Sequence, residues 1–446
     1  MGGPRRLFGT DGIRGVANVD LTAELALDLA VAAAHVVIEH LHTGARRPTA
    51  LVGRDPRASG EFLEAAVVAG LASAGVDVVR LGVLPTPAVA FLTAERGADL
   101  GVVLSASHNP MPDNGMKLFD ARGFKLPDAV EDEIEARLGE DWRRPTGADV
   151  GRVWSDPGAA ESYLEHLVAA LPHPLGGLRV VVDAAHGAAA ALAPQVLRRA
   201  GAEVIAIGAE PDGLNINDGY GSTYPQRLAA AVREAGADVG IAHDGDADRC
   251  LAVDAAGTLV DGDAILAICV LADREAGRLR GNAVVTTVMT NLGFKQAMEC
   301  HGIRVVETPV GDRYVLDAMR RADLSHGGEQ SGHLVFLDHA TTGDGLLTAL
   351  QLLGHVAAAG RPLTELAAVM TRLPQVLLNV AVPDQAKAMR DPGMLGAVAA
   401  AETRLNGAGR ILVRPSGTEP VVRVMVEAPT AAQARDTAEG IAAALR

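Results

Sequence analysis

A β-α-β unit recurs three times along this chain of 446 residues, and that repeat constrains the fold more than any other feature. Each copy opens with a Val-rich strand, continues into an amphipathic helix and returns as a second strand. The opening strands lie at 49–55, 178–187 and 282–291, and the returning strands at 76–82, 202–208 and 303–309. Gly75, Gly201 and Gly302 precede the returning strands, where a left-handed helix end favours a residue without Cβ.

The three copies predict three similar α/β domains with mixed, mainly parallel sheets covered by helices. One large doubly wound sheet is the alternative. From about residue 374 two strands flank a short loop between helices, which indicates a smaller C-terminal α+β domain with an antiparallel sheet. We therefore expect four domains around a central cleft, at 1–153, 154–254, 255–370 and 371–446.

The composition of the chain indicates which partners and which cellular compartment to expect. The formal net charge of −15 argues against a nucleic-acid partner, because binding to a phosphate backbone needs a basic surface. Cys250, Cys269 and Cys300 form no C-x-x-C pair, which favours a reducing cytoplasm over a disulfide framework or a zinc site. The apolar stretches are too short to span a bilayer, so we expect a cytoplasmic protein without a membrane partner.

The stretch "LSASHNPMPDNGMK" (104–117) follows an apolar strand, where open α/β sheets place their ligand sites. A serine hydroxyl there can act as a nucleophile or carry a phosphate. The alternative is that Ser105, Ser107 and Asn109 only satisfy the backbone of a turn, and the stretch taken alone favours the turn. Because Ser107 and His108 are adjacent, they do not indicate a Ser-His hydrolase pair.

The segment "AHDGDADRC" (242–250) carries three aspartates at alternate positions, Asp244, Asp246 and Asp248. Carboxylates that close repel one another unless a cation lies among them, and hard oxygen donors suit Mg²⁺. An EF-hand loop would need glycine and glutamate where Arg249 and Ala255 stand, so that motif is excluded. A solvated acidic turn remains the alternative.

Three further loops carry polar groups. "VRPSGTEPVVR" (413–423) indicates a phosphate cradle, because Arg414 and Arg423 offer bidentate donors, Ser416 and Thr418 offer hydroxyls, and Gly417 exposes backbone amides. In "GGEQSGHL" (327–334) Glu329, Ser331 and His333 alternate and could bind sugar hydroxyls, although a polar turn fits equally well. "FGTDGIRG" (8–15) places Arg14 in a loop before the first long helix, where a solvated arginine explains it almost as well as substrate contact.

Taken in order, "FGTDGIRG", "SASHNP", "DGDADR", "GEQSGH" and "RPSGTEP" resemble the α-D-phosphohexomutase superfamily. The resemblance extends to "LGVLPTPA" (81–88), "NGMKLF" (114–119) and "TPVGDRYV" (308–315), and so covers essentially the whole chain. "GEQSGH" and "VGDRYV" are most similar to the phosphoglucosamine mutase branch. Three α/β domains and a smaller C-terminal domain are the fold that this resemblance implies.

The resemblance also implies a role for each loop. Ser107 would carry the phosphoryl group, and Asp244, Asp246 and Asp248 would hold Mg²⁺ together with a phosphoserine oxygen. Glu329 and Ser331 would contact sugar hydroxyls. The distal phosphate of the substrate would be bound by Arg414, Ser416, Gly417, Thr418 and Arg423, and the cleft would be lined by Arg14, His108, Lys117, Arg249, Arg313 and His333.

The implied reaction interconverts glucosamine 6-phosphate and glucosamine 1-phosphate through a sugar 1,6-bisphosphate, for UDP-N-acetylglucosamine and cell-wall precursor synthesis. Phosphoryl transfer depends mainly on positioning and charge neutralisation, which the cationic residues of these loops can provide. Lys117 and His333 are both candidates for the general acid or base, and the sequence does not rank them. The alternatives are a phosphomannomutase/phosphoglucomutase and a non-catalytic phosphosugar-binding protein, and a homodimer is a family expectation.

Overall fold

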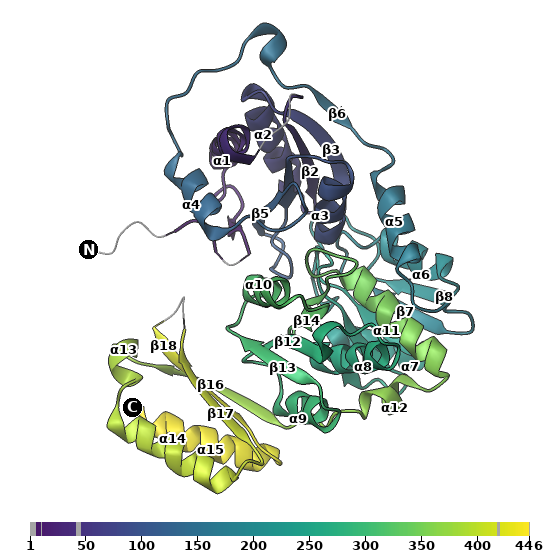
Figure 1. The fold of residues 1–446 in the computed structure, drawn as a ribbon, viewed down its shortest axis with the longest axis vertical. Helices are drawn as coiled ribbons and strands as arrows, with labels where there is room; N and C mark the ends of the chain where they lie inside the picture. Colours follow the sequence, from purple (N-terminus) through teal and green to yellow (C-terminus); the bar gives the residue numbers. More distant parts are fainter. Residues whose placement is uncertain (1–5, 10, 42–45, 417–419, 446) are drawn as a thin grey trace. The chain divides into compact units, whose positions relative to one another are not determined.

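The computed structural model describes residues 6–9, 11–41, 46–416 and 420–445. The chain forms two compact units (Figure 1). One contains the chain up to Met289 together with Arg304–Ala368, and the other contains Thr290–Ile303 and the chain from Val369 onwards. Among the described residues no helix combines the length and the apolar character needed to cross a membrane.

The first sheet has the strand order β1-β5-β4-β2-β3-β6. Strands β2, β3, β4 and β6 are parallel, and β5 is antiparallel to both β4 and β1. Its strands are β1 (Ile13–Val16), β2 (Thr49–Arg54), β3 (Asp77–Val83), β4 (Leu100–Leu104), β5 (Asp113–Asp120) and β6 (Val153–Ser155). The helices of this region are α1 (Ala23–Val36), α2 (Ser59–Ser73), α3 (Thr86–Glu95) and α4 (Asp128–Ala136).

The second sheet has the order β11-β10-β9-β7-β8, and β7, β8 and β9 are its parallel strands. Its strands are β7 (Arg179–Asp183), β8 (Glu203–Ile207), β9 (Val239–Ala242), β10 (Leu251–Asp254) and β11 (Leu259–Val260). The helices are α5 (Ala159–Ala169), α6 (Leu192–Arg199) and α7 (Pro225–Ala235).

The third sheet has the order β13-β12-β14-β15, with β15 antiparallel to β14. Its strands are β12 (Ala283–Thr287), β13 (Arg304–Thr308), β14 (His326–Gly328) and β15 (Leu334–Phe336). Helices α8 (Gly262–Glu275), α10 (Asp312–Ala322), α11 (Gly345–Ala359) and α12 (Leu363–Ala367) belong to the same unit. Short turns of π- or 3₁₀-helix lie at Val37–Leu41, Gly147–Asp149 and Arg280–Asn282.

The strand orders confirm the predicted repeat. Sheets one, two and three contain the runs β5-β4-β2-β3, β10-β9-β7-β8 and β15-β14-β12-β13. In each run the first strand of the copy lies between the second and the third, and an antiparallel fourth strand follows the third. All five residues of the third strand of copy one, Leu100–Leu104, are buried, as expected for a parallel strand covered on both faces.

The C-terminal unit contains an antiparallel sheet, β16-β18-β17, with α14 and α15 packed on it (Figure 1). Its elements are β16 (Gln375–Ala381), α13 (Gln385–Ala388), α14 (Pro392–Leu405), β17 (Arg410–Pro415), β18 (Val421–Glu427) and α15 (Ala431–Ala444). This is the smaller α+β domain that the sequence predicts.

Helix α9 (Leu292–Cys300) connects β12 to β13 but belongs to the C-terminal unit. The Asn291 side chain exchanges two hydrogen bonds of 3.0 Å with the backbone of Leu373, and the Leu292 amide donates to Glu427 at 2.9 Å. The repeat in the sequence assigns this helix to the third α/β domain. In the structure it belongs to the same compact unit as the C-terminal strands. The exact domain boundaries remain predictions.

Gly201 provides a test of the helix ends in the repeat. It follows α6 with φ of +105°, a conformation that L-residues with a side chain rarely adopt. Gly201→Ala should lower the free energy of unfolding by about 1–2 kcal/mol, measured by urea denaturation. Gly440→Ala, inside α15 with no atom near the added methyl group, is the control and should raise it by up to about 1 kcal/mol.

Candidate active site

Three polar loops leave their sheets at the same point of the repeated unit. Residues 105–112 join β4 to β5, residues 243–250 join β9 to β10, and residues 329–333 join β14 to β15. Each loop therefore runs from the third strand of its copy to the antiparallel fourth strand. The sequence motifs singled out for serine, carboxylate and sugar contacts occupy equivalent places in the fold.

The aspartates of the second loop form a buried cluster. Asp244, Asp246 and Asp248 each offer a carboxylate oxygen, and these oxygens lie within 4.8 Å of one another. Burial, followed by the charges of Asp248 and Asp246, raises the pKa of Asp244 above its usual range. Within the described residues, the buried Oδ1 atoms of Asp246 and Asp248 have no hydrogen-bond partner. Such an oxygen-rich, under-neutralised cluster fits a divalent cation that prefers oxygen ligands.

Ser107 of the first loop reaches this cluster directly. Its hydroxyl donates to Asp244 Oδ2 at 2.6 Å, and the residue is 1% exposed. Its φ of +52° places it in the left-handed region, which costs a residue with a side chain about 1–2 kcal/mol. Strain of this kind persists where the surroundings enforce it, often at functional sites.

His108 lies next to the same hydroxyl, with Nδ1 at 3.3 Å from Ser107 Oγ. Burial, together with the positive charges of Arg249 and Arg14, lowers the pKa of His108 to about 4. The imidazole is therefore neutral at physiological pH. It can donate or accept one hydrogen bond beside the serine without adding a charge.

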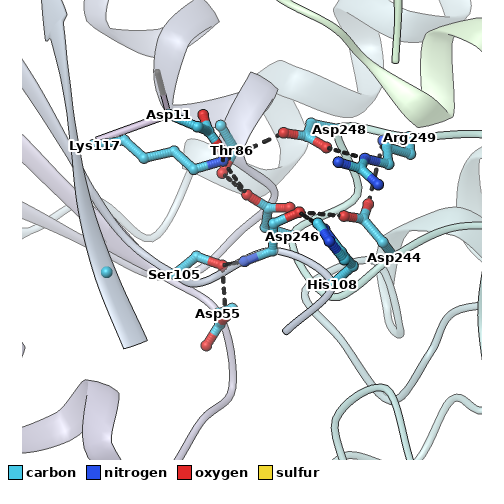
Figure 2. A network of polar contacts seen from close by, with 12 residues as sticks. Asp11, Asp55, Thr86, Ser105, His108, Lys117, Asp244, Asp246, Asp248 and Arg249 are labelled. Atoms are coloured by element: carbon cyan, nitrogen blue, oxygen red, sulfur yellow. Dashed lines mark hydrogen bonds and ion pairs between the residues drawn. The ribbon is translucent and has the colours of Figure 1, made fainter. Parts of the chain in front are cut away.

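Lys117 brings a positive charge to the aspartates (Figure 2). Its Nζ lies 2.8 Å from Asp246 Oδ2, 3.3 Å from Asp248 Oδ2 and 3.0 Å from Asp11 Oδ2. Burial acts to lower the pKa of Lys117, but the three carboxylates outweigh it and hold the pKa well above its usual value. Lys117 is thus a fixed ammonium ion within the acidic cluster. Asp11 also pairs with Lys125 and Arg14, which extends the charge network.

Thr86, the first residue of α3, holds Asp246 at two points. Its hydroxyl donates to Asp246 Oδ2 at 2.6 Å, and its amide donates to the Asp246 carbonyl at 3.0 Å. The hydroxyl bond is drawn in Figure 2. Asp246 therefore lies at the N-terminus of a helix, where the macrodipole favours a negative charge.

The third loop lies against the second. The Cys250 amide donates to the Gly332 carbonyl at 3.0 Å. Glu329 accepts from the Gly311 amide at 3.1 Å, and the Ser331 hydroxyl donates to Glu329 at 3.5 Å. These contacts fix the positions of the Glu329 carboxylate and the Ser331 hydroxyl, which are the groups predicted to contact the sugar.

His333 borders a cavity of about 220 Å³ that is also lined by Lys125, Asp312 and Arg313. Its Nε2 lies 3.6 Å from Asp312 Oδ2 and has no hydrogen-bond partner among the described residues. A buried imidazole nitrogen left in this state is available to a ligand group that enters the cavity.

Comparison with known proteins decides the family. Four models described as phosphoglucomutase/phosphomannomutase match the chain in order: alpha/beta/alpha domain I at residues 5–143, domain II at 161–257, domain III at 261–373 and the C-terminal domain at 377–444. The chain belongs to the phosphoglucomutase/phosphomannomutase family. This membership confirms the resemblance to the phosphohexomutases.

Individual members of this family match over nearly their full length. The chain is 66% identical to a phosphoglucosamine mutase of Acidothermus cellulolyticus, with 99% of this chain and 96% of the relative covered. It is 64% identical to a phosphoglucosamine mutase of Streptomyces griseus, with 98% of each covered. A crystal structure of a phosphoglucomutase/phosphomannomutase family protein from Burkholderia thailandensis superimposes with a TM-score of 0.83 at 26% identity, covering 99% of this chain and 97% of that one.

One group of the predicted site residues lies at or beside the aspartate cluster: Ser107, His108, Lys117, Arg14 and Arg249. Arg14 lies beside the first loop, 3.4 Å from Asn109 Oδ1, and the Arg249 amide donates to Asp244 at 3.2 Å. Arg313 differs, because its guanidinium pairs with Asp128 and, at 2.9 Å, with Glu131 of α4. It borders the cavity near His333, and its ion pairs are with α4 rather than with the three aspartates.

The predicted phosphate cradle lies in the C-terminal unit. Arg414 and Arg423 face each other across β17 and β18, and burial together with the charge of Arg423 lowers the pKa of Arg414. The Ser416 amide donates to the Val421 carbonyl at 2.9 Å, which closes the turn. Gly417 and Thr418 lie outside the described residues. Two cations placed side by side suit an anion.

Asp11, Thr86 and Asp312 take part in the site although the sequence prediction did not single them out. All three stand inside motifs shared with the family: Asp11 in "FGTDGIRG", Thr86 in "LGVLPTPA" and Asp312 in "TPVGDRYV". Polar residues within those motifs were therefore an available signal, but one sequence does not show which of them face the aspartates.

Thr86→Val tests whether the hydroxyl of Thr86 orders the metal site. The substitution keeps the shape of the side chain and removes the donor to Asp246, so affinity for Mn²⁺, measured by calorimetry, should fall by about 10–100-fold. Thr93→Val on the same helix is the matched control, because Thr93 donates only to the Val89 carbonyl. Equal Mn²⁺ affinities for the two variants would contradict the assignment.

Proposed function

We propose that the protein interconverts glucosamine 6-phosphate and glucosamine 1-phosphate, as a phosphoglucosamine mutase with a phosphoserine at Ser107. One observation carries the proposal: the Ser107 hydroxyl lies 2.6 Å from Asp244 at the edge of a buried cluster of three aspartates. A hydroxyl and a cation site in contact are what a phosphoryl carrier needs. The names of the relatives at 64–66% identity support the choice of glucosamine phosphate.

In the proposed reaction phospho-Ser107 donates its phosphoryl group to the free hydroxyl of the sugar monophosphate. The bond from phosphorus to Ser107 Oγ breaks, a bond to the sugar oxygen forms, and the sugar hydroxyl loses its proton to a base. The resulting sugar 1,6-bisphosphate reverses its orientation in the site. Its other phosphoryl group is then transferred to Ser107 by the reverse of the first step. The bisphosphate is therefore both the intermediate and the activator of an unphosphorylated enzyme.

Asp244, Asp246 and Asp248, with an oxygen of the phosphoserine, are the proposed Mg²⁺ ligands. Mg²⁺ would supply charge neutralisation at the phosphoryl group and require no redox chemistry. Lys117 adds a fixed positive charge on the same side. Because three carboxylates hold its proton, Lys117 suits electrostatic stabilisation better than proton transfer.

His333 is the better of the two candidates for the general acid or base. Its Nε2 borders the cavity beside Asp312 and lacks a hydrogen-bond partner among the residues described. Glu329 and Ser331 are the proposed contacts to sugar hydroxyls. Arg414, Ser416, Gly417, Thr418 and Arg423 are the proposed contacts to the phosphate that does not react.

We propose four domains, at 1–153, 154–254, 255–370 and 371–446. They would supply, in that order, the phosphoserine, the metal ligands, the contacts to sugar hydroxyls and the contacts to the phosphate that does not react. We retain a cytoplasmic location, a homodimer and the absence of nucleic-acid or membrane partners as proposals that rest on composition and on the family. None of them enters the chemistry at Ser107.

Ser107→Ala tests the shuttle. The variant has no oxygen to accept a phosphoryl group, so incubation with glucose 1,6-bisphosphate should leave its intact mass unchanged, and mutase turnover should fall by at least about 1000-fold. Ser73→Ala removes a hydroxyl that donates to the Gly70 carbonyl in α2 and should keep both phosphate uptake and turnover. Full mutase activity of the Ser107→Ala protein would refute the shuttle.

The rates of the wild-type enzyme on glucosamine, glucose and mannose phosphates test the choice of sugar. We expect the largest kcat/KM for glucosamine 6-phosphate. A preference for either neutral hexose would identify a phosphomannomutase/phosphoglucomutase instead. Binding of all three without any turnover, in a protein carrying phospho-Ser107, would identify a phosphosugar-binding protein.

A further inference from the structure

We propose that Arg57 and Asn217 are positioning residues that hold the backbone of Ser107 in the conformation needed for phosphoryl exchange. The inference rests on the proposed function, because it assigns the two residues a role in that reaction. Neither side chain touches the three aspartates in any described contact. Both act on the loop that carries the serine.

Arg57 follows β2 and is completely buried. Its Nη2 donates to the carbonyls of Ser107 at 3.0 Å and Asn109 at 2.8 Å. Its Nη1 donates to the carbonyls of Pro110 at 2.6 Å and Asp113 at 3.0 Å. With Nε bound to a carboxylate, all five N–H groups of the guanidinium are used, three of them on the serine loop and one on Asp113 at the start of β5. A lysine has only three donors and cannot reproduce the planar fork.

The same arginine also fixes the backbone amide of Ser107, through the side chains of Asp55 and Ser105. Arg57 Nε donates to Asp55 Oδ2 at 2.9 Å, and the Ser105 hydroxyl donates to that oxygen at 2.6 Å. Ser105 Oγ accepts the Ser107 amide at 2.9 Å (Figure 2 shows the Ser105 and Asp55 side chains). The amide and the carbonyl of Ser107 are therefore both tied to one buried ion pair.

Asn217 holds the loop from the second repeat. Its Nδ2 donates to the carbonyls of Ser107 at 2.9 Å and Asn109 at 3.1 Å, the same two that bind Arg57 Nη2. The backbone N–H of Asn217 donates to the Ala185 carbonyl, and the residue has a φ of +59°. A Cβ at Gly245, inside the aspartate loop, would come within 2.6 Å of the Ser107 carbonyl and 2.8 Å of Asn217 Nδ2. The serine loop, the aspartate loop and Asn217 are therefore in close contact.

The charge on the serine explains why such a clamp is needed. Phosphorylation adds about −1.5 to −2 charges beside Asp244, so the electrostatic force on the Ser107 side chain changes at every phosphoryl transfer. Ser107 also occupies a left-handed conformation that an unrestrained serine would leave. Donors on the carbonyl side keep the backbone in place while the side chain changes charge. The clamp should therefore affect the rate of transfer more than the binding of the sugar.

The test compares two variants with matched controls. Arg57→Lys keeps a positive charge beside Asp55 but loses the fork, and Arg54→Lys is its control, because Arg54 pairs with Glu64 instead. Asn217→Gly removes the amide and tolerates the positive φ, and Asn406→Gly, at the left-handed end of α14, is its control. The measurements are kcat, KM, phosphate uptake from glucose 1,6-bisphosphate, and hydrogen exchange of a peptide spanning 104–113.

We expect kcat and the rate of phosphate uptake to fall by about 100-fold in Arg57→Lys, as for a misplaced reacting group, with a smaller fall in Asn217→Gly. KM should stay near the wild-type value, and amide exchange of 104–113 should accelerate in both variants and in neither control. If both variants match their controls in kcat and in exchange, the clamp is refuted. If KM rises while kcat stays unchanged, the residues serve substrate binding and the inference is wrong.

Mutase activity and hydrogen exchange of 104–113 report separately on the proposed function and on the clamp. A wild-type enzyme without mutase activity would overturn the function, whereas the exchange of 104–113 would still show whether Arg57 and Asn217 hold the loop. If Arg57→Lys does not fold, as judged by circular dichroism, Asn217→Gly decides alone, since it removes no buried charge. Unchanged exchange of 104–113 in that variant would refute the clamp.

Discussion

The repulsion among the three buried aspartates is the constraint on which the site depends. Two unit charges 4 Å apart interact by about 4 kcal/mol at an effective dielectric constant of 20, which exceeds the cost of a left-handed serine. Lys117 offsets part of this repulsion through its contacts with Asp246 and Asp248. The remaining negative charge favours a divalent cation. The serine loop, the ammonium ion and the N-terminus of α3 are all placed where they relieve or use this charge.

The sequence predicted the repeat and the class of each sheet, because these depend on local pattern, whereas the roles of the three polar loops came from the resemblance to the phosphohexomutases. Val-rich strands followed by helices and glycine specify β-α-β units wherever they occur. Polar residues directly after an apolar strand must lie at a sheet edge, so Ser107 and the aspartates could be placed without a structure. The spacing of Asp244, Asp246 and Asp248 within one short loop predicted a cation site, with a solvated acidic turn as the alternative, and the structure brings their carboxylate oxygens within 4.8 Å of one another.

Contacts between distant segments were not predictable, because they depend on how one sheet is placed beside another. Nothing in "FGTDGIRG" shows that Asp11 meets Lys117 and Lys125, and nothing in "GRDPR" shows that Arg57 binds four carbonyls between β4 and the start of β5. Arg313 is a further example. Its motif indicated a cleft residue and it borders the cavity near His333, but nothing in the motif shows that Glu131 of α4 pairs with its guanidinium. Helix α9 likewise follows the repeat in sequence and joins the C-terminal unit in space.

The equivalent placement of the three loops has a consequence for how such proteins can change. In each copy the strands form the scaffold, and the segment between the third and fourth strands carries one of the predicted site motifs. Triplication of one ancestral unit would supply three such segments, which could then diverge separately. Substitutions in 329–333 could alter the choice of sugar while 105–112 and 243–250 retained the phosphoryl chemistry. Evolution of substrate range would thus be decoupled from evolution of the reaction.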